Sequence, residues 1–164
     1  MKTIRVSKAL VASLNTTLTL ALFILHTANA QTGTSVEQGD WPVYHGDEFS
    51  QRYSPLDQIN AENVSSLEIA WRFETSNFGP STDFNNPSTP LEIDGVLYVN
   101  VGSTRNVAAL DATTGQVLWL WRPQEGSRYD EAPRKGAGRG VAYYSKEGKT
   151  RVIDVTPGYQ LVSL

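Results

Sequence analysis

Apolar and polar residues alternate along residues 89–122 in four short runs that are separated by turn-forming residues. Alternation with a period of two is typical of β-strands that bury one face. The runs occupy residues 89–94, 96–101, 106–112 and 116–122, and the turns lie at Asp94-Gly95, near Gly102 and at Thr114-Gly115. Turn signals that recur about every ten residues predict a four-stranded antiparallel meander.

The same pattern begins again after a loop at residues 123–138. Three further runs lie at residues 139–145, 150–156 and 159–164, with turns at Glu147-Gly148 and Pro157-Gly158. A fourth run is missing from this second unit. Two successive meanders predict an all-β repeat architecture, in which each unit buries its faces against its neighbours. We therefore expect the chain to be the N-terminal fragment of a longer protein, with one complete and one incomplete unit.

The chain before residue 89 lacks this regular alternation. Residues 41–56 mix aromatic residues with turn formers, which predicts irregular packed structure. Residues 60–69 are expected to contain one short helical turn, with Asn60 as a candidate cap. Residues 70–75 alternate and predict a strand, and the Asn-, Pro-, Ser- and Gly-rich residues 76–88 predict a long loop.

The first thirty residues have the parts of a secretory signal peptide. Three basic residues give a positive start, followed by a short apolar core at residues 18–25 and the small residues of a cleavage site at residues 28–30. An uncleaved anchor is the weaker alternative, because the apolar core is too short to span a bilayer. We predict a signal peptide at residues 1–30 and an exported chain over residues 31–164.

Composition narrows the class of protein. The chain is 40% hydrophobic and 10% aromatic, as in globular domains rather than in disordered or membrane-embedded chains. Its formal net charge of −3 gives no support for nucleic-acid binding, which needs a clustered basic face. Because the chain has no cysteine, it can form neither a disulfide nor a thiolate metal site.

Residues 107–123 form the most informative predicted hairpin. Asp111 is placed to accept hydrogen bonds from the turn backbone, and Gly115 can adopt the positive φ that such a turn requires. Ala109 leaves space beside the backbone. Trp119 lies on the outer strand, where its ring can cover a neighbouring unit and its indole N–H can donate to a carbonyl. Repeated around a ring, this pattern would join adjacent units.

These residues resemble the tryptophan-docking motif, Ala-x-Asp-x-x-Thr-Gly-x-x-x-Trp, of quinoprotein dehydrogenases that depend on pyrroloquinoline quinone (PQQ). Residues 41–60 resemble the N-terminal signature of that family, and "GRGVAYY" at residues 138–144 resembles its Arg-Gly-Val-Ala-Tyr-Trp element. The resemblance covers residues 41–164. It implies an eight-bladed β-propeller, of which the chain holds one complete four-stranded blade, one incomplete blade and, at residues 63–75, a strand of the closing blade.

The resemblance also implies part of a cofactor site. The arginine of the family element contacts the quinone oxygens of PQQ, and here that residue is Arg139; the alternative is a solvated arginine at a strand start. Lys135 lies where related members place another side chain over the cofactor, and a solvent-facing lysine is the alternative. The family's catalytic base and calcium ligands lie in later blades, so no catalytic or metal-binding residue is assigned within this chain.

Two positions depart from the family pattern. Many alcohol-oxidising members have adjacent cysteines just before the arginine, which form a disulfide over PQQ, whereas this chain reads "APRKGAG". Many relatives have Glu or Gln before the first strand, where this chain has Pro87. Asn86 could supply that contact if the loop were shifted by one residue.

The implied function is that of an oxidoreductase with PQQ and calcium as cofactors. The whole enzyme would oxidise an alcohol or sugar hydroxyl by hydride transfer to the quinone and pass the electrons to a respiratory quinone or cytochrome. It would work in the periplasm, with or without membrane attachment, and this fragment alone is expected to be inactive. The alternative is a cofactor-free propeller of the same repeats that acts as an envelope assembly scaffold.

Overall fold

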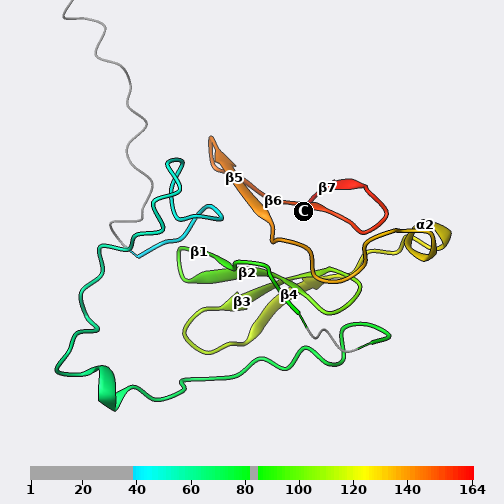
Figure 1. The fold of residues 1–164 in the computed structure, drawn as a ribbon. Coiled ribbons are helices and arrows are strands. Elements are labelled where there is room, and N and C mark those ends of the chain that lie inside the picture. Colours follow the sequence, from blue (N-terminus) through cyan, green and yellow to red (C-terminus); the bar gives the residue numbers. More distant parts are fainter. Residues whose placement is uncertain (1–38, 82–84) are drawn as a thin grey trace, which may run out of the picture. The chain divides into compact units, whose positions relative to one another are not determined.

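The computed structural model describes residues 39–81 and 85–164, and the strands within these ranges form two antiparallel sheets (Figure 1). The first sheet contains, paired in chain order, β1 (Leu91–Ile93), β2 (Val96–Val101), β3 (Asn106–Asp111) and β4 (Val117–Trp121). The second contains β5 (Ala142–Lys146), β6 (Lys149–Val155) and β7 (Leu161–Ser163). The predicted all-β fold, with one four-stranded and one three-stranded unit, is confirmed.

Helical structure in the described residues is limited to single turns. The 3-10 turn η2 (Val64–Ser66) confirms the short helical turn expected within residues 60–69, but its N-cap residue is Asn63, not Asn60. Asn60 instead caps the turn before it, because its Oδ1 accepts hydrogen bonds from the N–H groups of Glu62 and Asn63 at 3.1 and 3.2 Å. One α-helical turn, α2 (Ser127–Asp130), lies in the loop between the sheets. No helix in the described ranges is long and apolar enough to cross a membrane. The predicted signal peptide at residues 1–30 lies outside the described residues.

Two-residue turns connect the first hairpin of each sheet, β1–β2 and β5–β6. The β1–β2 turn at Asp94 and Gly95 and the β5–β6 turn at Glu147 and Gly148 have positive φ at both central residues, between +52° and +77°. This is the geometry of a type I′ turn, which matches the right-handed twist of the flanking strands. The turn residues singled out in the sequence therefore fix the register of both hairpins.

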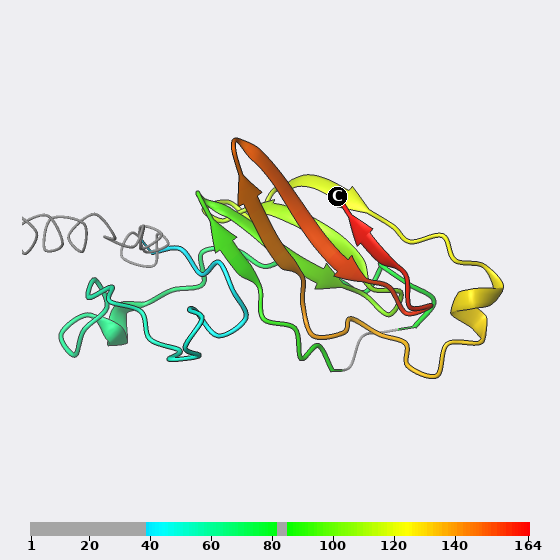
Figure 2. The same cartoon turned by 90° about the horizontal axis from the view of Figure 1, so that it is seen from above.

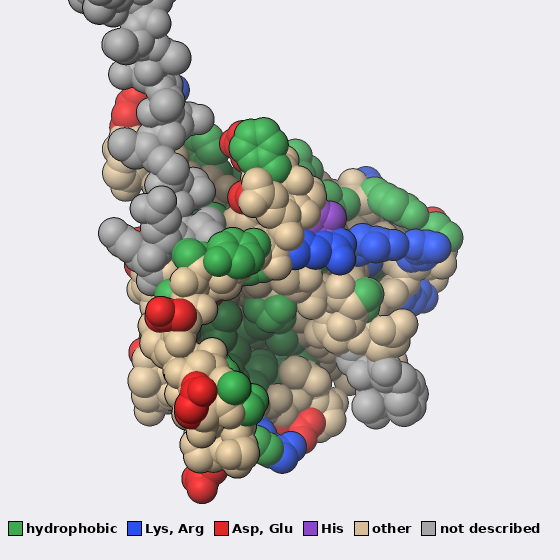
Figure 3. Space-filling view, turned by 60° about the vertical axis from the view of Figure 1, so that its left-hand side comes forward, with side chains coloured by type: hydrophobic (Ala, Val, Ile, Leu, Met, Phe, Trp, Pro, Cys, Tyr) green, Lys and Arg blue, Asp and Glu red, His purple; other side chains and the backbone are tan. Residues whose placement is uncertain are grey.

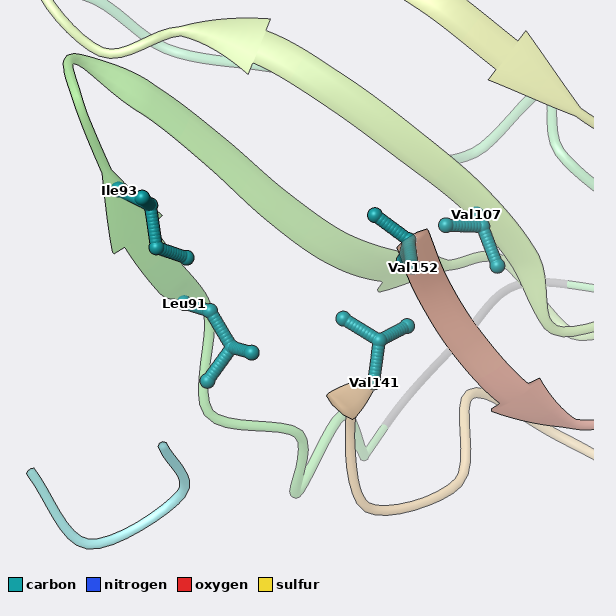
Figure 4. Packing of buried hydrophobic residues seen from close by; sticks show 5 residues of the cluster. All are labelled: Leu91, Ile93, Val107, Val141 and Val152. Atoms are coloured by element: carbon teal, nitrogen blue, oxygen red, sulfur yellow. The ribbon is translucent and has the colours of Figure 1, made fainter. Parts of the chain in front are cut away.

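One hydrophobic cluster joins the two sheets, as Figure 4 shows. Leu91 and Ile93 of β1 and Val107 of β3 pack against Val141 and Val152 of the second unit, and all five side chains are buried. Burial of apolar surface stabilises such a junction by about 25 cal/mol per Å² removed from water. The two sheets thus share a core, as expected for repeat units that cover each other's faces.

Strand β3 is buried on both faces. While Val107 belongs to the cluster between the sheets, Ala108 and Leu110 belong to a second cluster, in which Trp71 and Phe73 are partly buried. Successive residues of a strand point to opposite faces, so β3 forms a middle layer between the second sheet and the preceding segment. This position explains why its side chains are small or aliphatic.

Trp71 packs on the β3–β4 turn. Its indole Nε1–H donates to the Ala112 carbonyl at 3.1 Å, and its ring covers Gly115, where an added Cβ would lie 2.6 Å from ring carbons. Gly115 has a φ of +72°, and Asp111 Oδ1 accepts a hydrogen bond from the Thr114 N–H at 2.7 Å. The turn roles predicted for Asp111 and Gly115 are confirmed.

Trp119 lies beside the second unit, as expected, and lines a cavity with Tyr143 of β5 and Val152 of β6, whereas the β3–β4 turn itself is covered by Trp71. Trp119 pairs with Ala109 in the β3–β4 ladder, lies with its ring centroid 6.1 Å from that of Tyr98, and is 37% exposed. No carbonyl of residues 39–81 or 85–164 accepts its indole N–H.

The strand predicted at residues 70–75 is not formed within the described part of the chain. A strand needs a neighbour for its backbone N–H and C=O groups, and no described strand pairs with this segment. It contributes Trp71 and Phe73 to the second cluster instead. Further upstream, Trp41 forms an isolated antiparallel bridge with Glu92 of β1, with N···O distances of 2.7 and 3.1 Å.

The N-terminal arm, defined as residues 39–75, leaves large apolar side chains exposed. They include Phe49, Tyr53, Ile59, Leu67 and Ile69. The start of the arm lies at the end of the sheets away from α2 (Figure 2). On the face drawn in Figure 3, hydrophobic side chains line a hollow between polar and charged ones. Exposed apolar surface of this extent is typical of a contact site.

Candidate cofactor site

A cavity of about 940 Å³ opens beside the junction of the two sheets. Its wall comprises residues 134–140, which we call the Arg139 loop, together with the start of β5, the end of β6 and Arg105 from the β2–β3 turn. Cavities of about 300–1,000 Å³ are typical of small-molecule and cofactor sites. Both site residues predicted from the sequence, Lys135 and Arg139, line this cavity.

Arg139 lies in the turn three residues before β5 and carries an exposed side chain. Its guanidinium has no hydrogen-bond or ion-pair partner among the described residues. The backbone on either side is held closely: a Cβ at Gly140 would lie 3.1 Å from the Thr89 carbonyl oxygen. Arg139 is therefore a free cation on an anchored segment, and its predicted contact with a cofactor stays a prediction.

Lys135 is held by α2. Its Nζ donates to the Asp130 carbonyl at 3.0 Å and lies 4.9 Å from the centroid of the Tyr129 ring. A helix C-terminus and an aromatic face both attract a cation. The Lys135 side chain is exposed to solvent and also lines the cavity. This placement agrees in part with each alternative from the sequence, a side chain over the cofactor or a solvent-facing lysine.

The loop before β1 brings Asn85 and Pro87 to the cavity, but not Asn86. The Asn86 side-chain amide donates to the Asn100 carbonyl at 3.1 Å, and its Oδ1 accepts a hydrogen bond from the Ser88 N–H at 3.0 Å. These contacts tie Asn86 into the loop backbone. The suggested replacement of the family's Glu or Gln by Asn86 is therefore not supported by its position.

Arg105 is a lining residue that the sequence did not reveal. It comes from the β2–β3 turn, and its Nε and Nη1 donate to the carbonyls of Gly136 and Val155 at 3.0 and 2.7 Å. Arg134 also lines the cavity and was not singled out either. Their spacing from Arg139 along the chain carries no signal, because the contact between the turn and the loop arises only when the two sheets pack.

Asp154 of β6 is a buried carboxyl in the cavity wall. It is 3% exposed, and its Oδ1 accepts a hydrogen bond from Asn100 Nδ2 at 3.2 Å. Asp154 Oδ2 and Asn100 Oδ1 have no hydrogen-bond partner. Burial raises the pKa of the Asp154 carboxyl, and the hydrogen bond from Asn100 and the charge of Arg105 oppose this only in part.

Cationic side chains dominate the cavity wall. Arg105, Arg134, Lys135 and Arg139 line it, against the single carboxyl of Asp154. Guanidinium groups match carboxylates in charge and geometry. The arrangement therefore favours a ligand with several negative charges. In residues 39–81 and 85–164, no group of three or more His, Cys, Asp or Glu side chains is placed to hold a metal ion.

Residues 41–164 match the family described as "PQQ: Glucose/ethanol/alcohol dehydrogenase, beta-propeller domain". The chain belongs to this PQQ dehydrogenase family. The match spans the N-terminal arm and both sheets, so β1–β4 form one propeller blade and β5–β7 form part of the next. The predicted resemblance and the propeller fold are confirmed.

Two relatives illustrate how much of a PQQ dehydrogenase this chain represents. It is 36% identical over 126 residues to the dehydrogenase subunit of the quinone alcohol dehydrogenase of Gluconobacter oxydans (strain 621H), covering 72% of this chain and 16% of that protein. It is 34% identical over 129 residues to the quinoprotein glucose dehydrogenase of Escherichia coli (strain K12), covering 77% of this chain and 15% of that protein. The chain thus spans about a sixth of either relative.

Solved structures give the same assignment. The quinohemoprotein alcohol dehydrogenase from Comamonas testosteroni superimposes with a TM-score of 0.56 and 30% identity, over 76% of this chain and 19% of that one. A europium-containing methanol dehydrogenase superimposes with a TM-score of 0.57 and 27% identity, over 71% of this chain and 19% of that one. All four named proteins are dehydrogenases, and none supports the alternative of a scaffold.

The residues present fit the family cofactor. PQQ is a polycarboxylate with a quinone, and the wall described above offers four cations, of which Arg139 has no partner among the described residues. The structure offers no comparable fit for calcium, since the described residues provide no ligand cluster.

Proposed function

We propose that this chain forms one wall of the PQQ site in a dehydrogenase that oxidises an alcohol or sugar hydroxyl. The observation that carries the proposal is the guanidinium of Arg139, three residues before β5, which has no partner among the described residues and lies in a cavity lined by cations. Family membership supports the choice of PQQ as the ligand. The activity belongs to the whole protein, of which this chain supplies part.

Arg139 would stabilise negative charge on an oxygen at the cavity. When bound, PQQ supplies the acceptor for the hydride from the substrate. The N–H groups of Arg139 would donate to that oxygen, and donors aimed at a site where charge develops stabilise it. The neighbouring backbone is hydrogen-bonded at Gly136 and closely packed at Gly138 and Gly140, so the start of the side chain is held beside the cavity before the ligand arrives.

Lys135 would contribute charge and orientation. Its ammonium is held by the Asp130 carbonyl and the Tyr129 ring, so it gives a fixed positive field beside the cavity. A fixed cation attracts a polycarboxylate and favours one orientation of it. Lys135 is therefore proposed as a binding residue, not as a proton donor.

The remaining parts of the reaction are proposed for the rest of the protein. Calcium as Lewis acid and a carboxylate as base would lie outside this chain, and the electrons would pass to a respiratory quinone or cytochrome. Export through a signal peptide at residues 1–30 would place the enzyme in the periplasm.

Substitution of Arg139 in the full-length protein tests the proposal. Arg139→Gln removes the charge but keeps polar bulk, and we expect PQQ to bind at least about tenfold more weakly and kcat to fall about 10²–10³-fold, the loss typical of one oxyanion donor. The dissociation constant of PQQ is measured by quenching of tryptophan fluorescence, and kcat at saturating PQQ.

Arg151→Gln is the matched control, because Arg151 on β6 donates only to the neighbouring Thr150 carbonyl and does not line this cavity. It should bind PQQ as the wild type does. An Arg139→Gln enzyme with wild-type affinity and kcat would refute the proposal.

A further inference from the structure

Arg105 is the last residue of the β2–β3 turn and has a left-handed backbone conformation. Its φ is +55°, in the left-handed region that residues with a side chain rarely adopt. The turn is closed by a hydrogen bond from the Arg105 N–H to the Gly102 carbonyl at 3.2 Å. Asp94 and Glu147 have nearly the same φ, +52° and +53°, in the two-residue turns of the β1–β2 and β5–β6 hairpins, so the conformation belongs to the turn.

The Arg105 side chain connects the first blade to two segments of the second unit. Nε donates to the Gly136 carbonyl in the Arg139 loop, and Nη1 donates to the Val155 carbonyl at the end of β6. The Gly136 N–H donates in return to the Ser103 carbonyl of the β2–β3 turn at 2.8 Å. Gly136 is thus bound through both of its backbone groups to the same turn.

The Arg105 guanidinium also packs against the residue that precedes Arg139. A Cβ at Gly138 would lie 2.7 Å from Arg105 Nε, and Gly138 has a φ of +77°. Only glycine fits this close approach without displacement of the guanidinium. The backbone of the Arg139 loop is therefore closely packed on both sides of Arg139, against Arg105 at Gly138 and against Thr89 at Gly140. These two contacts set its path towards β5.

We propose that Arg105 is a positioning residue that fixes Arg139 at the cofactor cavity. Arg105 acts through the backbone of the Arg139 loop. Its Nε and Nη1 donate to the carbonyls of Gly136 and Val155, and the planar guanidinium sets the distance between these two carbonyls. Lysine cannot replace it, because one ammonium on a flexible stem does not present two donors in a fixed plane. The inference rests on the proposed role of Arg139 in PQQ binding.

The first test needs no cofactor. In the full-length apoprotein, Arg105→Lys should increase the rate of amide hydrogen exchange at Gly136 at least about tenfold, since the Arg139 loop loses the paired hydrogen bonds from the Arg105 guanidinium. Arg128→Lys is the matched control: Arg128 donates one hydrogen bond to the Gly158 carbonyl, at 3.3 Å, and does not line the cavity. It should leave exchange at Gly136 unchanged.

The second test measures function in the same variants. Arg105→Lys should weaken PQQ binding by about tenfold and lower kcat at saturating PQQ, while the KM for substrate changes little. Arg128→Lys should behave as the wild type. Arg105→Ala combined with Gly138→Ala should show less than the product of the two single effects on the PQQ dissociation constant, because the guanidinium that the added Cβ meets is gone.

The outcomes separate the two claims. Wild-type exchange at Gly136 in Arg105→Lys, or wild-type PQQ affinity and kcat in that variant, would overturn the positioning role. Failure of the wild-type full-length protein to bind PQQ would overturn the proposed function, and the exchange measurement would still decide whether Arg105 clamps the Arg139 loop.

Discussion

At the scale of single residues, the Asn100–Asp154 pair is the most unusual feature of the cavity wall. Asn100 is 0% exposed, and one oxygen on each side chain has no hydrogen-bond partner. A buried acceptor without a donor costs about 1–3 kcal/mol. Because burial raises the pKa of Asp154, the native state holds its proton more tightly than the unfolded state does. The contribution of Asp154 to the free energy of unfolding is therefore fully present below the pKa of the unfolded state, where the carboxyl is protonated. It is lost as the pH rises through the higher pKa of the folded state.

Asp154→Asn should stabilise the protein at neutral pH by about 1–2 kcal/mol, since a neutral amide avoids burial of a charge and offers a donor to Asn100 Oδ1. The gain should shrink as the pH falls into the range where Asp154 itself is protonated. Thermal unfolding of the full-length apoprotein from pH 4 to pH 8 measures both effects.

Asn100→Asp is the control, because it places two carboxyl groups together and should destabilise the protein most at high pH. A variant Asp154→Asn that melts below the wild type at pH 7 would contradict this account of the pair.

The site residues show what the sequence could and could not predict at this scale. Arg139 lies within a recognisable motif and Lys135 lies four residues before it, so the sequence could single both out as candidates for a cofactor site. Arg105 and Asp154 come from a turn and a strand whose local patterns are ordinary. Their roles depend on contacts between the sheets, with partners about 30 to 50 residues away in the chain.

At the scale of elements, the docking of Trp71 on the β3–β4 turn joins the N-terminal arm to the first blade. Gly115 → Ala should weaken this docking, because the new Cβ would lie 2.6 Å from the Trp71 ring and the residue must keep a φ of +72°. We expect a loss of about 2–4 kcal/mol in the free energy of unfolding. Denaturant melts followed by tryptophan fluorescence measure it.

Gly148→Ala provides a matched control for backbone strain. Gly148 has almost the same φ, +73°, but an added Cβ would meet nothing within 4 Å. Its cost should be about 1 kcal/mol, the strain of the left-handed conformation alone. Equal costs for the two substitutions would show that contact with Trp71 contributes nothing.

The strands differ in how well the sequence predicted them. Residues 89–122 and 139–164 alternate, and their turn residues match the turns formed, so both sheets were predictable. Residues 70–75 alternate as well but pair with no described strand, because alternation reports which side chains can be buried and does not supply a neighbour. The docking of Trp71 on the β3–β4 turn was not predicted, because the carbonyl that accepts its indole N–H belongs to Ala112, 41 residues further along the chain.

At the scale of the whole molecule, the two sheets share a core, and the cavity of the Arg139 loop opens beside their junction. Other surfaces remain uncovered in this chain: Leu161 on β7 is 74% exposed, and the N-terminal arm presents several apolar side chains. The chain spans 15% and 16% of the two relatives compared above. The cavity wall described here is thus one side of the site proposed for the full enzyme.

The most direct test of the central claim is a crystal structure of the full-length protein with PQQ bound. The account predicts that PQQ occupies the cavity beside the Arg139 loop, with the Arg139 guanidinium within about 2.7–3.2 Å of a quinone oxygen. Arg105 should keep its hydrogen bonds to Gly136 and Val155. PQQ bound elsewhere, or Arg139 directed into solvent while the cofactor is in place, would contradict it.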